Sequence, residues 1–158
     1  GQNKGIEWQV NWLIASSLEI DTTLGYLRAR FDDYLTASGQ DLSGAEQPQA
    51  PEWMGSIGVT WQPTASWQAG LEWTAMDSYL FSDRHQTQSP SRQLVNGHLA
   101  WQWRDWQVSL WGRNLLDEDY FVRGFGSFGN DPRKGYVTEP YFQYGEPRTY
   151  GVTLEYRQ

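Results

Sequence analysis

Apolar and polar residues alternate along much of the chain, so that the apolar ones recur at every second position. From Ile6 to Ile14 the even positions are apolar, and only Leu13 interrupts the polar series between them. Trp111 is a second residue that falls out of such a pattern. Alternation predicts β-strands with one apolar and one polar face, whereas helical spacing is weak here. The pattern predicts about seven strands, near residues 6–14, 18–26, 52–62, 67–75, 98–104, 106–113 and 149–157.

The connections between these segments are of two kinds. Tight turns are expected at residues 15–17, 63–66 and 104–105, and long polar loops at 36–51, 83–92 and about 122–147. Short turns at one end and long loops at the other are typical of outer-membrane β-barrels, and a soluble sandwich has no reason to separate its loops in this way. The chain is therefore predicted to be all-β, an antiparallel transmembrane β-barrel.

The aromatic residues agree with this fold. The chain has 10 Trp and 9 Tyr among 158 residues, and such rings are favoured at membrane–water interfaces. Four Trp flank the tight turns and would form an aromatic girdle: Trp61, Trp67, Trp103 and Trp106. A second girdle is expected at the long-loop end, from Tyr34, Trp53, Tyr79 and Tyr120. The alternative is a row of core aromatics in a soluble sheet.

Composition excludes several classes of function. The net charge is -7 and no basic run occurs, which argues against nucleic-acid binding. The chain has no cysteine, so disulfides and thiolate metal sites are excluded. No apolar run is long enough for a transmembrane helix, and no signal peptide is visible at Gly1, so we expect a mature chain or a fragment. Seven strands also leave two exposed edges and an odd count, which predicts earlier strands of a bigger barrel.

Five stretches resemble one family, in the right order. They are residues 3–7, 24–34, 50–53, 106–120 and 145–156. The pair of motifs Asn-Leu-x-Asp-x-x-Tyr, from Asn114, and Gly-x-Pro-Arg-x-Tyr-Gly, from Gly145, is the most specific part. At this spacing the chain resembles the end of the barrel of TonB-dependent outer-membrane receptors.

This resemblance implies that residues 1–158 are the C-terminal segment, about the last seven strands, of a plugged barrel of about 22 strands in the outer membrane of a Gram-negative bacterium. Such receptors import ferric siderophores, cobalamin, haem or sugars, driven by the TonB energy-transducing complex of the inner membrane. The plug domain and the energy-coupling box are N-terminal in the family, and neither is in this sequence. The resemblance implies no enzyme activity and no cofactor.

The C-terminus departs from the family pattern. Members usually end on an aromatic residue, most often Phe, whereas this chain ends Arg157-Gln158. The barrel-assembly machinery reads a terminal pattern of polar, Gly, apolar and aromatic positions. That pattern can still be supplied by Thr149, Gly151, Leu154 and Tyr156.

Several motifs of possible chemistry have simpler explanations. Residues 124–129 match G-x-G-x-x-G, but the turn signal Asn130-Asp131-Pro132 follows instead of a helix, so a flexible extracellular loop is expected. The acidic residues 117–119 lack the spacing of a calcium loop. Two distant histidines, His85 and His98, make no metal site without further ligands. We therefore predict neither a catalytic nor a metal site.

Ligand contacts are expected in the long loops, because arginine pairs with anionic groups and aromatic rings stack on planar ones. The candidate set is Arg123, Phe125, Phe128, Arg133 and Tyr136. The expected partners are outer-membrane lipid and a small ligand such as a ferric siderophore. Two other classes stay open at this point: a soluble Trp-rich β-domain that binds carbohydrate, and a barrel enzyme such as a protease or lipase.

Overall fold

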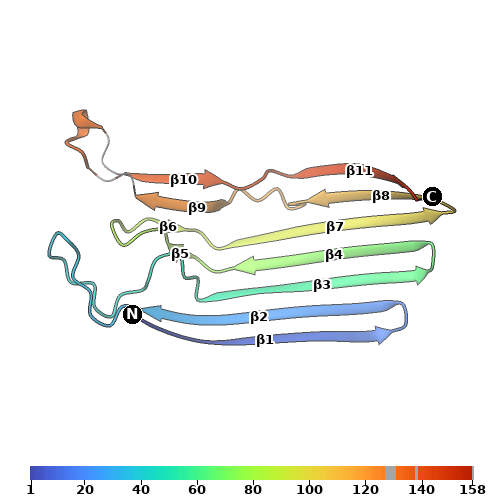
Figure 1. The fold of residues 1–158 in the computed structure, drawn as a ribbon, viewed down its shortest axis with the longest axis horizontal. Helices are drawn as coiled ribbons and strands as arrows, with labels where there is room; N and C mark the ends of the chain where they lie inside the picture. The colour runs from blue at the N-terminus through green and yellow to red at the C-terminus, as the bar shows by residue number, and fades with distance from the viewer. Residues whose placement is uncertain (127–130, 138, 158) are drawn as a thin grey trace.

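The computed structural model describes residues 1–126, 131–137 and 139–157, and within them one large antiparallel sheet dominates (Figure 1). Its seven strands lie in the order β1-β2-β3-β4-β7-β8-β11. Their bounds are β1 Gln2–Ala15, β2 Leu18–Arg30, β3 Trp53–Thr64, β4 Trp67–Met76, β7 Arg92–Trp103, β8 Trp106–Arg113 and β11 Thr149–Tyr156. Every neighbouring pair is antiparallel, which confirms the seven strands expected from alternation.

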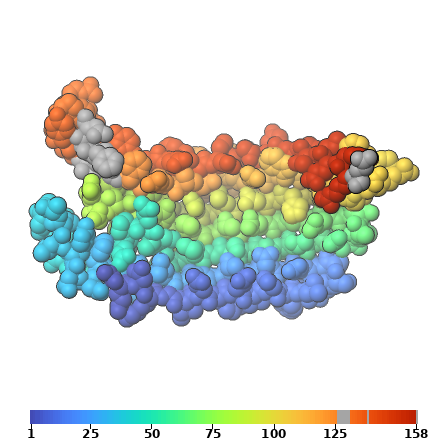
Figure 2. Space-filling view, viewed as in Figure 1, coloured from blue at the N-terminus to red at the C-terminus, as the bar shows by residue number. Residues whose placement is uncertain are grey.

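Two small hairpins extend the sheet at the long-loop end. They are formed by β5 Tyr79–Leu80 with β6 Gln88–Ser89, and by β9 Phe121–Gly126 with β10 Pro140–Tyr144. A short 3-10 helix, η1 Pro132–Lys134, follows β9 and projects beyond the sheet (Figure 2). The long connection expected over about 122–147 thus contains a hairpin, and residues 124–126 of the glycine-rich motif pair with β10.

The ends of the sheet differ as predicted. Tight turns join β1 to β2, β3 to β4 and β7 to β8 at one end, and the long connections gather at the other (Figure 1). The C-terminal strand β11 ends beside the tight turns, whereas β1 begins at the long-loop end. Among the described residues no helix is long and apolar enough to cross a membrane.

The register assigns each side chain to one of two faces. The apolar face carries, in register across the strands, rows such as Trp12–Ile20–Val59–Leu71 and Leu99–Leu110–Val152. The opposite, polar face carries rows such as Asn11–Asp21 and Glu72–Asn96. Leu13 and Trp111, the two residues that broke the alternation, lie on the polar face opposite Glu19 and Gly151.

The sheet is a single layer with almost no apolar interior. In the described part of the chain, the buried apolar residues are Ala29, Phe81 and Ala100. Large apolar side chains of the apolar face are instead open, with Ile6 72%, Val152 66% and Leu154 62% exposed. A row of core aromatics in a soluble sheet is therefore not what the structure contains. An open apolar face of this size needs a cover other than water.

Candidate functional site

The loops at the long-loop end are tied together by specific contacts. The Tyr34 hydroxyl donates to Asp83 Oδ2 over 2.6 Å, and this hydrogen bond raises the pKa of Tyr34 above its ordinary value. The amide of Gln49 donates to the carbonyl of Leu80 (2.7 Å). Arg92 Nη1 donates to the carbonyl of Phe121 over 2.7 Å. These bonds join three connections that are far apart in sequence.

An aromatic cluster forms the centre of this loop assembly. Phe81 is only 1% exposed and lies between the two small hairpins. Its ring centroid is 5.6 Å from that of Tyr79, 5.9 Å from that of Phe121 and 5.3 Å from that of Phe142. Gly124 makes room for it, because a Cβ there would lie 2.3 Å from the Phe81 ring. Gly124, the first glycine of the G-x-G-x-x-G match, thus serves aromatic packing.

Replacing Phe81 with alanine is expected to separate the two hairpins while leaving the large sheet intact. The reason is that the ring is the shared contact of β5–β6 and β9–β10, whereas the seven strands are held by their own backbone hydrogen bonds. Limited proteolysis should cut residues 79–89 and 121–144 faster, at an unchanged melting temperature of the sheet. An unchanged cleavage rate would contradict the role of the ring.

The opposite face of the β9–β10 hairpin carries the strongest candidate for ligand contact. Arg123 and Phe125 alternate with Gly124, so they point away from Phe81. The Arg123 guanidinium carbon lies 5.7 Å from the centroid of the Phe125 ring, and that ring stacks on Tyr141 at 6.0 Å with an interplanar angle of 18°. Phe125 is 41% and Tyr141 49% exposed. We name Arg123, Phe125 and Tyr141 the loop platform.

Arg133 and Tyr136 of the candidate set do not join the platform. Arg133 lies in η1, where its Nε and Nη2 donate to the two carboxylate oxygens of Asp131 (3.1 and 3.2 Å), an interaction that lowers the pKa of Asp131. Tyr136 follows in the same turn, with a φ of 60° and a side chain 65% exposed. Phe128 lies outside the described residues.

Tyr141 was missed by sequence reasoning. It pairs directly with Phe125 across the hairpin. The available signal was the aromatic-rich run Tyr141-Phe142-Gln143-Tyr144 after the glycine-rich segment, which is typical of a strand.

The Trp residues at the tight turns lie on one face, as expected for a girdle. Trp103 and Trp106 pair directly across their turn, and Trp67 stacks on Trp101 with centroids 6.0 Å apart. Trp61 and Trp67 flank the turn between β3 and β4. All four predicted girdle rings are between 40% and 51% exposed. Of the second predicted girdle only Trp53 lies on the apolar face, because Tyr34, Tyr79 and Tyr120 pack within the loops.

The predicted assembly residues all lie in β11. Leu154 and Tyr156 point from the apolar face, and Tyr156 lies against Trp106 with ring centroids 4.9 Å apart. Thr149 and Gly151 lie on the polar face, opposite Arg113 and Trp111. The alternation of the predicted signal thus matches the two faces of the strand.

The polar face contains a shallow depression with glycines at its floor. A Cβ at Gly58 would lie 2.3 Å from the Asp21 carboxylate, and one at Gly70 would lie 2.2 Å from the His98 ring. Asn96 Nδ2 donates to Glu72 Oε2 nearby (3.1 Å). Within the described residues no group of three or more His, Asp or Glu side chains is arranged to hold a metal ion.

Comparison with known proteins places this sheet in a family. A family model described as TonB dependent receptor-like, beta-barrel, matches residues 1–115. The ferric yersiniabactin uptake receptor FyuA from Yersinia pestis superposes with a TM-score of 0.79 at 18% identity, over 98% of this chain and 23% of that one. The siderophore receptor PiuA from Acinetobacter baumannii gives 0.75 at 16% identity, over 96% and 21%.

A third solved structure widens the range of ligands among similar folds. The copper transporter OprC matches with a TM-score of 0.65 at 19% identity, over 98% of this chain and 22% of that one. The chain therefore spans about a fifth of the length of these proteins.

The match to the family model covers well over half of the chain. Receptors of this family are transporters of the Gram-negative outer membrane and not enzymes, so a soluble carbohydrate-binding domain and a barrel enzyme are both set aside. The chain belongs to the TonB-dependent receptors, of whose β-barrel its sheet is a part.

Proposed function

We propose that this chain forms the last seven strands of a plugged barrel of about 22 strands that imports a ferric siderophore or a similar scarce ligand. The energy would come from the TonB complex, acting through the plug domain of the complete receptor. The ligand class is supported by the exposed loop platform, together with a fold shared with a receptor named for a siderophore and one named for ferric yersiniabactin.

The two faces support a position in a barrel wall. The open apolar face suits contact with acyl chains, because burial in hydrocarbon removes that surface from water. The polar face suits contact with a plug or with water inside a barrel. Its depression over Gly58 and Gly70 is lined by charged and amide groups, which would be costly against lipid.

The loop platform supports an anionic or aromatic ligand. The Arg123 guanidinium can pair with carboxylate or catecholate oxygens, and the stacked rings of Phe125 and Tyr141 offer a flat surface to a planar group. Arg133 and Tyr136, in the turn at η1, are proposed as separate ligand contacts outside the platform. The likeness to a copper transporter leaves a metal other than iron as the principal rival cargo.

Transport is tested in a strain that carries the complete gene as its sole such receptor. Uptake of radiolabelled iron is measured for a panel of ferric siderophores, with copper and haem in parallel. We expect saturable uptake of at least one ferric chelate that stops when TonB is deleted. Copper uptake without any iron uptake would replace the proposed cargo, and uptake that survives TonB deletion would overturn the proposed mechanism.

Replacing both Arg123 and Phe125 with alanine is expected to weaken ligand binding by at least about tenfold, since one charge-assisted contact and one stacking contact are lost. The affinity is measured by equilibrium binding of the labelled chelate to whole cells. Arg84→Ala is the matched control, because Arg84 is an exposed basic residue of another loop. Equal affinities for the double variant and the control would exclude the loop platform as a ligand contact.

A further inference from the structure

Three basic residues lie on the apolar face at the long-loop end of β1 and β2. Strand alternation places Arg28 and Arg30 on the same side as Tyr26, and Lys4 on the same side as Ile6. Tyr26 itself contacts Trp53, with ring centroids 4.7 Å apart. The basic side chains therefore begin about 7 Å beyond an aromatic pair of the kind that marks a membrane interface.

Two of these charges lack a counter-ion. Arg30 is partnered, because its Nη1 donates to the Gly44 carbonyl (3.0 Å) and its Nη2 lies 3.5 Å from Glu46 Oε1. Lys4 and Arg28 are both exposed and form no ion pair within the described residues. They are also direct cross-strand partners. Like charges in that position repel each other. An anion bound between Lys4 and Arg28 would attract both side chains and offset this repulsion.

The acidic groups near this cluster are already accounted for or stand apart. Glu46 pairs with Arg30, whereas Asp32 borders the same hollow as Lys4 and Arg28 but comes within 4.0 Å of neither charge. Glu52 and Asp77 border the same hollow as Arg28, but neither comes within 4.0 Å of its guanidinium. The side of Lys4 and Arg28 that faces away from the sheet remains available to an external anion.

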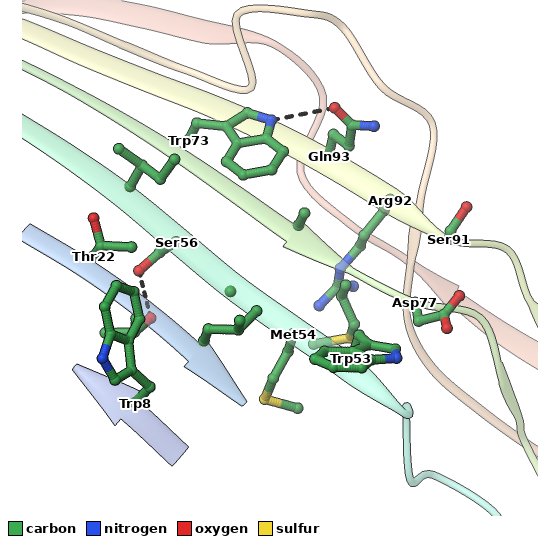
Figure 3. A pocket seen from close by; sticks show the side chains of 16 residues that line it. Trp8, Thr22, Trp53, Met54, Ser56, Trp73, Asp77, Ser91, Arg92 and Gln93 are labelled. Carbon is green, nitrogen blue, oxygen red and sulfur yellow. Dashed lines mark hydrogen bonds between the residues drawn. The ribbon is translucent and has the colours of Figure 1, made fainter. Parts of the chain in front are cut away.

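An apolar groove lies below this cluster on the same face of the sheet. Figure 3 shows Trp8, Trp53 and Trp73 standing around it, with Trp73 Nε1 donating to Gln93 Oε1 (3.2 Å). Its floor is low because Gly55 and Ala75, which pair across β3 and β4, carry little or no side chain. The groove has a volume of about 350 Å³, and Leu24 and Trp8 line it from the strands that carry Arg28 and Lys4.

We propose that Lys4 and Arg28 bind the phosphate of a phosphorylated lipid of the outer leaflet, one of whose acyl chains occupies the groove between Trp8, Trp53 and Trp73. Leu24 and Arg28 are four positions apart, about 13 Å along the strand, which suits a headgroup at the interface and a chain that runs inward from it. A free phosphate would use the charges but not the groove. This site rests on the outer-membrane location and is independent of the transported ligand.

The test uses the protein extracted from its native outer membrane in mild detergent and then stripped of lipid. Native mass spectrometry measures binding of diphosphorylated lipid A, of its dephosphorylated form and of phosphatidylethanolamine, with inorganic phosphate as competitor. Wild-type protein should retain diphosphorylated lipid A selectively. The variant Lys4→Gln/Arg28→Gln should bind it at least about tenfold more weakly, and should bind dephosphorylated lipid A and the zwitterionic phosphatidylethanolamine as the wild type does.

Two further variants separate the charges from the groove. Ala75→Phe fills the groove and should weaken both the phosphorylated and dephosphorylated lipids. Arg104→Gln/Arg157→Gln removes two charges at the opposite end of the sheet and should have no effect. The proposal is overturned if the Lys4/Arg28 variant retains lipid A as the wild type does, or if millimolar phosphate displaces it completely. Siderophore uptake, measured on the same variants, reports separately on the proposed transport function.

Discussion

Replacing Asn114 with alanine is expected to lower the free energy of unfolding by about 3–5 kcal/mol, because three part-buried hydrogen bonds to backbone groups are lost together. Asn114 is 3% exposed. Its Nδ2 donates to the carbonyls of Glu118 (2.9 Å) and Glu146 (3.1 Å), and its Oδ1 accepts from the amide of Glu118 (2.9 Å). One side chain thus fastens the end of β8 to the segment that leads into β11.

The backbone conformation of Asn114 adds a second cost to the alanine substitution. Its φ is 49°, in the left-handed region that asparagine tolerates better than alanine. The matched variant is therefore Asn114→Gly, which loses the same hydrogen bonds without that penalty. Stability is measured as the temperature at which the folded barrel loses its resistance to sodium dodecyl sulfate. We expect Asn114→Gly to be destabilised slightly less than Asn114→Ala, and wild-type stability of both would refute the hydrogen-bond role.

Replacing Gly151 with valine is expected to cost about 2–3 kcal/mol, because the space above its Cα is occupied by the ring of Trp111. A Cβ at this position would lie 2.5 Å from Trp111 Cζ2. The ring cannot move freely, since its Nε1 donates to Thr153 Oγ1 (3.1 Å) and the Arg113 guanidinium lies 5.5 Å from its centroid. Displacing the ring sacrifices both contacts.

A double-mutant cycle isolates this steric cause. Trp111→Ser removes the ring, so Gly151→Val in that background should cost much less than it does alone. Gly97→Ala is the control for glycine replacement as such, because a Cβ there would meet its nearest neighbours at an ordinary 3.5 Å. Strict additivity of the two changes, measured by the same unfolding assay, would show that Gly151 matters for another reason, such as recognition by the assembly machinery.

The seven long strands were predictable because each has two faces of different polarity. In a single-layer sheet each face meets one kind of environment, so the alternation runs along the whole strand. The start of β7 was set too late, because Asn96 and Gly97 interrupt the apolar series. Trp111 was seen to break the pattern, but the reason was not visible in the sequence, since its place on the polar face depends on Gly151 of another strand. Strand length also mattered: β5 and β6 have two residues each, too few for alternation to be visible.

The candidate site was predicted less completely than the fold. Arg123 and Phe125 were selected for their chemistry, and their separation by one residue was a sign of a strand that the surrounding glycines concealed. Gly124 is there for the Phe81 ring, a partner 43 residues away in sequence, which no local pattern reveals. The basic pair Lys4 and Arg28 required the strand register before its place on the apolar face became apparent.

The outermost strands β1 and β11 each bond to a neighbour on one side only. About half of the peptide groups in each therefore point away from the sheet. In hydrocarbon every such unpaired group would cost several kcal/mol. For an open sheet, this total cost exceeds the free energy gained by burying the apolar face in lipid. Insertion into the bilayer and the pairing of the free edges of β1 and β11 must therefore be a single cooperative event. An open sheet of these strands in lipid is not a stable intermediate.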